Sequence, residues 1–144
     1  MDDSARYRLV LFRLGQHLLA VPADSVREVV PAGRATRIPG AAALVAGLVN
    51  VRGTLLTVID GRIALGLERA SAPAESVLVL DRGERSLGLM VDEVLDLVEV
   101  APSDLRDGER PAGLDPLMVS AAGMDAGRVF AVLDTDRLLA PALP

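Results

Sequence analysis

His17 is the only histidine in the chain and the first candidate for acid–base or nucleophilic chemistry. A serine–histidine–aspartate triad would need a serine nucleophile beside the imidazole, on a sharp turn that exposes its hydroxyl. The sequence contains no such nucleophile motif, and His17 directly follows Gly15-Gln16, which has the composition of a tight turn. We therefore interpret His17 as an exposed turn residue and predict no catalytic residue.

Four carboxylates, Asp92, Glu93, Asp96 and Glu99, form the second candidate for chemistry. Such groups hold metal ions or act as paired acids and bases. In a β-strand, however, Asp92 and Asp96 would lie on one face and Glu93 and Glu99 on the other. The calcium-loop pattern Asp-x-Asp-x-Asp-Gly is also missing. We interpret the four carboxylates as a solvated rim or a partner-facing edge, and we predict no metal ligand.

The composition excludes several cofactors and partners. The chain has no cysteine, and all 15 of its basic residues are arginine, which excludes thiol chemistry, a phosphate-binding lysine and a lysine Schiff base. Its glycines match no phosphate-binding loop, so we predict no cofactor. The net charge of −5, the scattered arginines and the 2% aromatic content leave neither a basic stripe nor a stacking platform for nucleic acid.

The apolar pattern predicts an all-β chain with short helices. Apolar residues make up 51% of the sequence, enough for a buried core. The longest uncharged stretch, residues 38–51, is too short to span a membrane. The acidic N-terminus has no signal-peptide pattern, so we expect a cytoplasmic protein without direct membrane insertion. We expect strands at residues 7–14, 18–21, 46–51, 54–60, 77–80, 87–91, 94–100, 118–122 and 128–133, and short helical turns at residues 26–30, 41–44, 62–67 and 135–139.

The sequence contains an internal repeat. When residues 9–30 are laid on residues 77–98, five positions are identical, and both segments run in the order strand, glycine turn, strand, Asp-x-Val. This order predicts a duplicated β unit and hence two similar small barrels. The alternative is that two unrelated hairpins with glycine turns look alike.

The strongest candidate for binding is an apolar patch with one acid and one base at its edge. Glu28 lies between Val26 and Val29, and Arg52 follows Val49 in an expected tight turn. Protein interfaces combine an apolar centre with a charged rim, and they favour arginine. The pattern therefore indicates a protein-docking site. The alternative is that the valines belong to the core and the charges are ordinary surface groups.

Three blocks of sequence resemble the CheW family of chemotaxis adaptors. They are residues 19–29 (LAVPADSVREV), 47–60 (GLVNVRGTLLTVID) and 87–94 (LGLMVDEV). The blocks come in the family's order and at its spacing, and the resemblance covers about residues 7–139. The departures are small: Thr57 stands where the family usually has proline, and Gly61 where it usually has leucine.

The resemblance implies a fold of two five-stranded, SH3-like β barrels with a groove between them. The two barrels would be intertwined subdomains of a single CheW-like domain across residues 1–144. Within this domain, residues 1–6 and 140–144 are expected to be flexible termini.

The resemblance also implies a non-catalytic adaptor that couples chemoreceptors to a CheA-type histidine kinase. One barrel end would dock on the regulatory domain of the kinase, and the groove would take the cytoplasmic tip of a receptor. Other CheW-like domains are further candidate partners, in receptor arrays at the membrane. Val26, Glu28, Val29, Val49 and Arg52 would form the protein-binding surface, with Arg52 paired to Glu28.

A different class of function stays open, a β-barrel module that binds a small ligand or another protein outside chemotaxis. Barrels that bind oligosaccharides or oligonucleotides present a dedicated binding face, for which we would expect aromatic residues. Tyr7, Phe12 and Phe130 are the only aromatic residues in the chain, which weighs against this alternative. An enzyme would need a convergent polar pocket.

Overall fold

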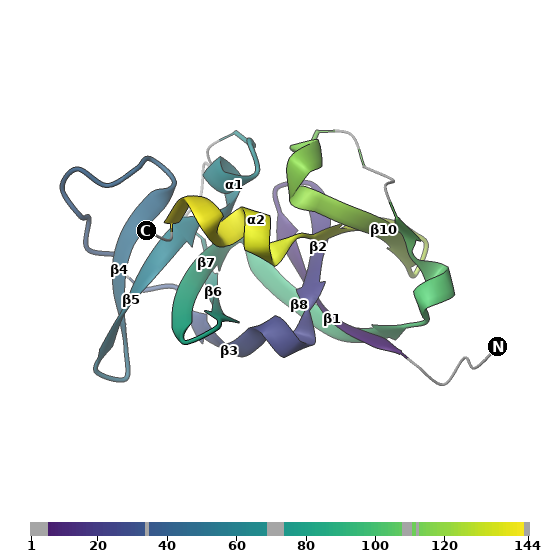
Figure 1. The fold of residues 1–144 in the computed structure, drawn as a ribbon, viewed down its shortest axis with the longest axis horizontal. Coiled ribbons are helices and arrows are strands. Elements are labelled where there is room, and N and C mark those ends of the chain that lie inside the picture. Colours follow the sequence, from purple (N-terminus) through teal and green to yellow (C-terminus); the bar gives the residue numbers. More distant parts are fainter. Residues whose placement is uncertain (1–5, 34, 69–73, 108–110, 112, 143–144) are drawn as a thin grey trace.

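The computed structural model describes residues 6–33, 35–68, 74–107, 111 and 113–142, and it contains two β-sheets side by side (Figure 1). The first sheet has six strands, in the spatial order β8 (Glu93–Val100), β1 (Tyr7–Leu14), β2 (His17–Pro22), β11 (Arg128–Leu133), β10 (Val119–Asp125) and β9 (Arg106–Asp107). The second sheet has five strands, in the order β3 (Val26–Pro31), β6 (Ser76–Arg82), β7 (Arg85–Val91), β5 (Thr54–Asp60) and β4 (Val45–Val51). The predicted pair of five-stranded units is confirmed, with β9 as an addition to the first. The groove expected between them stays a prediction.

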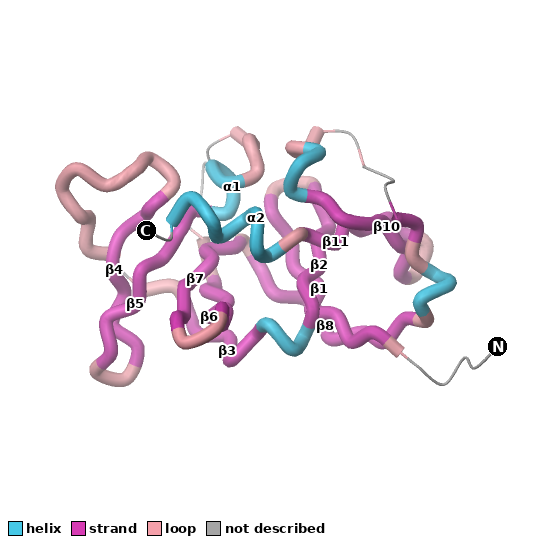
Figure 2. The backbone as a smooth tube through the Cα atoms, in the orientation of Figure 1, coloured by secondary structure: helices cyan, strands magenta, loops and turns pink. Residues whose placement is uncertain are grey.

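The second sheet uses the continuous run of strands from β3 to β7, whereas the first sheet combines β1 and β2 with β8 to β11 (Figure 2). The β1–β2 hairpin belongs to the first sheet, but the next strand, β3, pairs with β6 of the second sheet. The β6–β7 hairpin belongs to the second sheet, but β8 returns to pair with β1 of the first. The two connections, from β2 to β3 and from β7 to β8, therefore tie the sheets together.

The strand registers repeat with the offset of the sequence repeat. Leu11 faces Ala20 in the first hairpin, and the residues laid on them, Val79 and Gly88, face each other in the second hairpin. The parallel pairs also correspond, since β11 joins β2 and β5 joins β7. The duplicated unit predicted from the sequence is thus present in the backbone.

The strands that follow these two connections, β3 and β8, each contain a bulge at the same position of the repeat. Arg27 is skipped where β3 pairs with β6, and Leu95 is skipped where β8 pairs with β1. A bulge changes the face to which the neighbouring side chains point. Val26 and Val94, which precede the bulges, both pack against the core between the sheets.

Apolar side chains fill three clusters, one between the two sheets and one associated with each sheet alone. Alternate residues of β1 enter different clusters: Leu9 and Leu11 pack within the first sheet's own core, whereas Phe12 and Leu14 pack between the sheets. Burial on both faces explains why both alternating sets of this strand are apolar. The cluster between the sheets is called the central cluster below.

The helical turn predicted at residues 26–30 is wrong, because this segment is strand β3. The helical turn lies just before it, as the 3-10 helix η1 (Ala23–Ser25). Valine is β-branched and favours an extended backbone, and β6 offers an edge with which the segment can pair. The helical turn predicted at residues 41–44 is also wrong, since residues 41 and 42 are irregular and residues 43 and 44 form a turn.

Two short helices begin at aspartates that directly follow or end a strand. Asp60 caps α1 (Gly61–Ala64), and its Oδ1 accepts the N–H of Arg62 at 2.9 Å. Asp134 caps α2 (Thr135–Leu139) in the same way, and the helical turn predicted at residues 135–139 is confirmed. Such caps satisfy backbone donors that the first turn of a helix leaves unpaired.

The remaining short elements are the 3-10 helices η2 (Pro102–Asp104), η3 (Pro116–Met118) and η4 (Ala140–Ala142). The last lies in the segment expected to be a flexible terminus, while residues 1–5 and 143–144 of the two expected termini lie outside the described residues. Within the described part of the chain, no helix has the length and apolar character needed to cross a membrane.

Gly88 lies where the second sheet's own core leaves no room for a side chain. An added Cβ would lie 2.8 Å from Val77 Cγ1 and 2.9 Å from Val58 Cγ2. We expect Gly88→Ala to lower the free energy of unfolding, measured in urea, by about 1–3 kcal/mol through overpacking. Gly33→Ala is the control, because a Cβ there meets nothing within 4 Å. An equal effect of the two changes would contradict this explanation.

Candidate functional site

The tip of the β4–β5 hairpin presents Arg52 to solvent. Arg52 and Gly53 have φ angles of 51° and 84°, as the two central residues of a type I′ turn require. The Gly53 N–H donates to Asn50 Oδ1 at 2.8 Å, which fixes the turn. The sequence Asn-Val-Arg-Gly therefore holds an arginine at the end of the second sheet in a backbone conformation that glycine would adopt more easily.

Arg52 pairs with Glu28, which follows the β3 bulge. Arg52 Nη1 donates to Glu28 Oε2 at 3.1 Å, and Arg52 Nη2 lies 2.9 Å from Oε1. Oε1 is buried and receives no hydrogen bond of good geometry, so this second contact is ionic. The side chain of Arg52 is 77% exposed and that of Glu28 is 22% exposed. The structure thus contains the pair expected from the resemblance, with the arginine outermost.

The three valines of the predicted site lie in different surroundings. Val29 is 44% exposed and can contact another protein. Val26 is partly buried against the central cluster, beneath the surface. Val49 is only 5% exposed and belongs to the second sheet's own core, because alternation along β4 turns its side chain inward. The expectation that Val49 lies on the protein-binding surface is therefore corrected, because its side chain packs beneath that surface.

Leu55 is an exposed apolar residue that the sequence reasoning missed. It is 65% exposed and, with Glu28, Arg52 and Glu84, lines a pocket of about 480 Å³ at the end of the second sheet. The signal was available, since Leu55 and Leu56 are consecutive in a strand and only one of them can face the core. We call Glu28, Arg52 and Leu55 the Arg52 surface.

The sequence matches the family model of the CheW-like domain over residues 8–142. The chain belongs to the CheW-like family. The CheW protein of Rhizobium meliloti is 33% identical to it over 99 residues, which are 68% of this chain and 64% of the relative. The CheW protein of Klebsiella aerogenes is 26% identical over 139 residues, 95% of this chain and 84% of the relative. Protein PilI of Pseudomonas aeruginosa is 37% identical over 87 residues, 60% of this chain and 49% of the relative.

The chain spans just under two thirds of the Rhizobium relatives, 64% of the R. meliloti protein and 60% of a probable CheW of Rhizobium etli. Among solved structures, the scaffolding protein TtCheW from Thermoanaerobacter tengcongensis has a TM-score of 0.81 with this CheW-like chain. The identity is 21%, and 90% of each chain is covered, so the likeness shows a shared fold. Several relatives are named chemotaxis protein CheW, and this chain belongs to the same CheW-like family.

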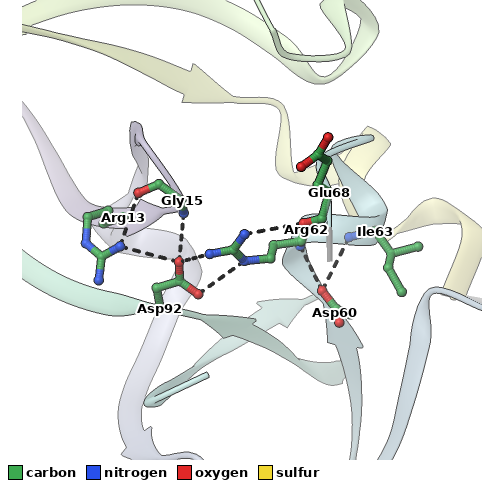
Figure 3. Close-up of polar contacts among 7 residues, drawn as sticks. All are labelled: Arg13, Gly15, Asp60, Arg62, Ile63, Glu68 and Asp92. Atoms are coloured by element: carbon green, nitrogen blue, oxygen red, sulfur yellow. Dashed lines mark hydrogen bonds and ion pairs between the residues drawn. The ribbon is translucent and has the colours of Figure 1, made fainter. Parts of the chain in front are cut away.

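The interpretation of the four carboxylates as a solvated rim is wrong for Asp92. Asp92 is 9% exposed, whereas Glu93, Asp96 and Glu99 are exposed. It follows β7, where the chain crosses between the sheets, and it accepts hydrogen bonds from Arg62 (Figure 3). The exposed three fit the prediction, while the fourth is part of the interior.

The carboxylate of Asp92 has a shifted pKa with a consequence for acid stability. Burial by itself raises the pKa of Asp92, but hydrogen bonds from Arg62 and Gly15 and the positive charges of Arg62 and Arg13 outweigh it and hold the pKa below its ordinary value. The folded-state pKa is then lower than the unfolded-state pKa. The ionised carboxylate therefore stabilises the fold above about pH 4, and this contribution is lost as the pH falls through the folded-state value.

We expect Asp92→Asn to flatten the decline of the free energy of unfolding between about pH 4 and pH 2, measured by urea unfolding across the pH series. Asp24→Asn is a matched control, because Asp24 is the exposed residue at the same position of the repeat. Its decline should match that of the wild type. Parallel declines for the wild type and Asp92→Asn would contradict the assignment.

His17 begins β2 and is half-buried, which corrects its interpretation as an exposed turn residue. A Cβ on Gly113 would lie 3.0 Å from His17 Cε1, so the imidazole packs beside that glycine. Among the residues that the structure describes, no group of three or more histidine, cysteine, aspartate or glutamate side chains is arranged to hold a metal ion.

Proposed function

We propose that the chain is a non-catalytic chemotaxis adaptor that couples methyl-accepting chemoreceptors to a CheA-type histidine kinase. Membership of the CheW-like family, together with relatives named chemotaxis protein CheW, supports the general role. The observation that carries the finer proposal is the Arg52–Glu28 pair beside the exposed Leu55 at the end of the second sheet. Exposed aliphatic surface next to a well-oriented arginine is typical of protein contacts.

The Arg52 surface and the exposed Val29, the residue after Glu28 in β3, would contact the kinase regulatory domain or the cytoplasmic tip of a receptor. A receptor tip presents amphipathic helices, and recognition of such helices needs aliphatic contacts together with a few charges that set the register. Leu55 and Val29 supply the aliphatic contacts, and the Arg52–Glu28 pair supplies the charges. Val26 and Val49 would hold this surface in shape from beneath.

The expected affinity is modest. Small transient interfaces give dissociation constants on the order of micromolar. Clustering of many adaptors, kinases and receptors then raises the overall affinity through avidity. The chain would accordingly work in receptor arrays next to the membrane, with other CheW-like domains as neighbours.

The direct test is calorimetric titration of the chain with two purified partners from the same genome, a CheA-type regulatory domain and a soluble receptor-tip fragment. We expect a dissociation constant on the order of micromolar for each partner. Binding of neither would refute the proposal. A thermal shift with a small molecule, without any protein partner, would support the alternative of a ligand-binding barrel.

The Arg52–Glu28 pair itself can be tested by charge exchange. Because Arg52 is largely exposed, each single reversal, Glu28→Arg or Arg52→Glu, should lower the free energy of unfolding by no more than about 1 kcal/mol. The double exchange should recover most of that loss, measured by urea unfolding of all four proteins. A double variant as unstable as the sum of the two single variants would show that the residues do not interact.

A further inference from the structure

A buried carboxylate joins three segments at the boundary between the two sheets (Figure 3). Asp92 lies between β7 of the second sheet and β8 of the first. Its Oδ2 accepts the N–H of Gly15, in the β1–β2 turn of the first sheet, at 2.7 Å. Arg62 belongs to α1, directly after β5 of the second sheet, and donates to both carboxylate oxygens, with Nε 3.4 Å from Oδ1.

Arg13 completes this arrangement from β1. Its Nη1 lies 3.4 Å from Asp92 Oδ2 and donates to the carbonyl oxygen of Gly15 at 3.1 Å. The backbone takes part as well, because the Asp92 N–H donates to the Arg13 carbonyl at 3.1 Å. We call Arg13, Gly15, Arg62 and Asp92 the Asp92 cluster. Asp92 is bound by Arg62 of α1, which follows β5 of the second sheet, and by Gly15 and Arg13 of the first sheet, so its carboxylate links the two.

Helix α1 approaches this boundary very closely. A Cβ on Gly61 would lie 2.7 Å from the Met90 carbonyl oxygen and 2.9 Å from Leu14 Cδ1. Leu14 ends β1, so the backbone of Gly61, the first residue of α1, packs directly against a side chain of the first sheet. The backbone of α1 that carries Arg62 is therefore packed against both sheets.

The apolar contacts between the sheets depend less on direction than the hydrogen bonds of the Asp92 cluster do. The central cluster is built from aliphatic side chains and Phe12, and burial of such surface is favourable but non-directional. Hydrogen bonds to an ionised group depend on geometry and are stronger than neutral ones. A buried polar group can therefore select one arrangement among several that bury similar apolar area.

Among the contacts of the described residues, the related position of the repeat has no equivalent buried one. The residue laid on Asp92 is Asp24, which is exposed. There the second sheet's hairpin meets α2 through the ion pair of Arg82 with Asp136, whose side chains are 38% and 74% exposed. Exposed pairs contribute little, so the directional contacts between the sheets are concentrated on the Asp92 side.

We propose that the Asp92 cluster fixes the orientation of the first sheet relative to the second, while the central cluster holds the two sheets together. Loss of the cluster would leave each sheet intact and widen the range of angles between them. This inference does not depend on the proposed function.

Distance measurements between spin labels test the inference, and the absence of cysteine makes the labelling specific. One label pair spans the sheets, Leu55→Cys with Val129→Cys, and a control pair lies within the first sheet, Leu97→Cys with Val129→Cys; all three positions are exposed. Double electron–electron resonance would be recorded for each pair in the wild-type background and with Asp92→Asn or Arg62→Gln. We expect a broader distribution for the spanning pair only.

Arg62→Lys serves as a conservative variant, because it keeps the charge but not the planar fork. We expect it to restore part of the narrow distribution that Arg62→Gln loses. If Asp92→Asn does not fold, the two Arg62 variants decide the matter. An unchanged spanning distribution in every folded variant, or equal broadening of the control pair, would overturn the inference.

Discussion

Arg52→Glu is expected to raise the dissociation constant for a CheA-type regulatory domain or a receptor tip by at least about tenfold, equivalent to 1.4 kcal/mol. The change removes the outermost cation of the Arg52 surface and places a second carboxylate beside Glu28, 22% exposed. Like charges in contact at an interface cost far more than the loss of one surface contact. Titration calorimetry with the wild-type and variant chains measures the effect.

The fold should survive this change, because the pair is an exposed one and contributes no more than about 1 kcal/mol to stability. Arg52→Asn is a useful intermediate, since asparagine tolerates the positive φ of this turn and removes the cation without adding a carboxylate. Arg37→Glu, at another exposed arginine of the loop before β4, controls for net charge. If Arg37→Glu and Arg52→Glu weaken binding equally, the Arg52 surface is not the docking site.

Asp92→Ala is expected to lower the free energy of unfolding by about 3 kcal/mol, near the lower end for breaking a buried ion pair. The change leaves Arg62 without its carboxylate and the Gly15 N–H without its acceptor, 2.7 Å away in the intact protein. Arg13 is half exposed and can be solvated by water, which keeps the loss from being larger. Urea unfolding followed by circular dichroism measures the difference.

Asp96→Ala provides the matched control on the following strand. Asp96 is exposed, and its Oδ1 accepts only the neighbouring Leu97 N–H among the contacts described. Surface substitutions of this kind usually change stability by less than about 0.5 kcal/mol. Comparable losses for Asp92→Ala and Asp96→Ala would show that the Asp92 cluster has no special energetic role.

The two-sheet architecture could be predicted because the signals for it are local or repeated. The glycine turns at Gly15 and Gly83 align in the repeat, and the backbone registers follow the same offset. Strand β1 is apolar on both alternating faces, which predicts burial on both sides. These features require no knowledge of which strands meet in space.

The segment of β3 could not be predicted in the same way. Its short run of valines is compatible with a strand or a helical turn, and periodicity over so few residues does not separate them. The decision is made by β6, whose edge pairs with Val26 and Val30 although it lies far along the chain. Tertiary pairing thus overrides the helical turn that the local sequence predicts at residues 26–30.

Burial of Asp92 was also out of reach of sequence reasoning. Its partners Arg62 and Gly15 lie 30 and 77 residues away, so no spacing rule connects them. For Leu55 the sequence shows only that one of Leu55 and Leu56 is exposed, and the register of the β4–β5 hairpin decides which of the two faces the core. The Arg52–Glu28 pair was found only because the family resemblance placed both residues on one surface.

The most direct test of the adaptor function is kinase activity in a reconstituted mixture of receptor, CheA-type kinase and this chain. The account predicts that the receptor changes the rate of kinase autophosphorylation only when the chain is present, and that Arg52→Glu removes this dependence while remaining folded. Receptor control of the kinase that is the same with and without the chain would contradict the account.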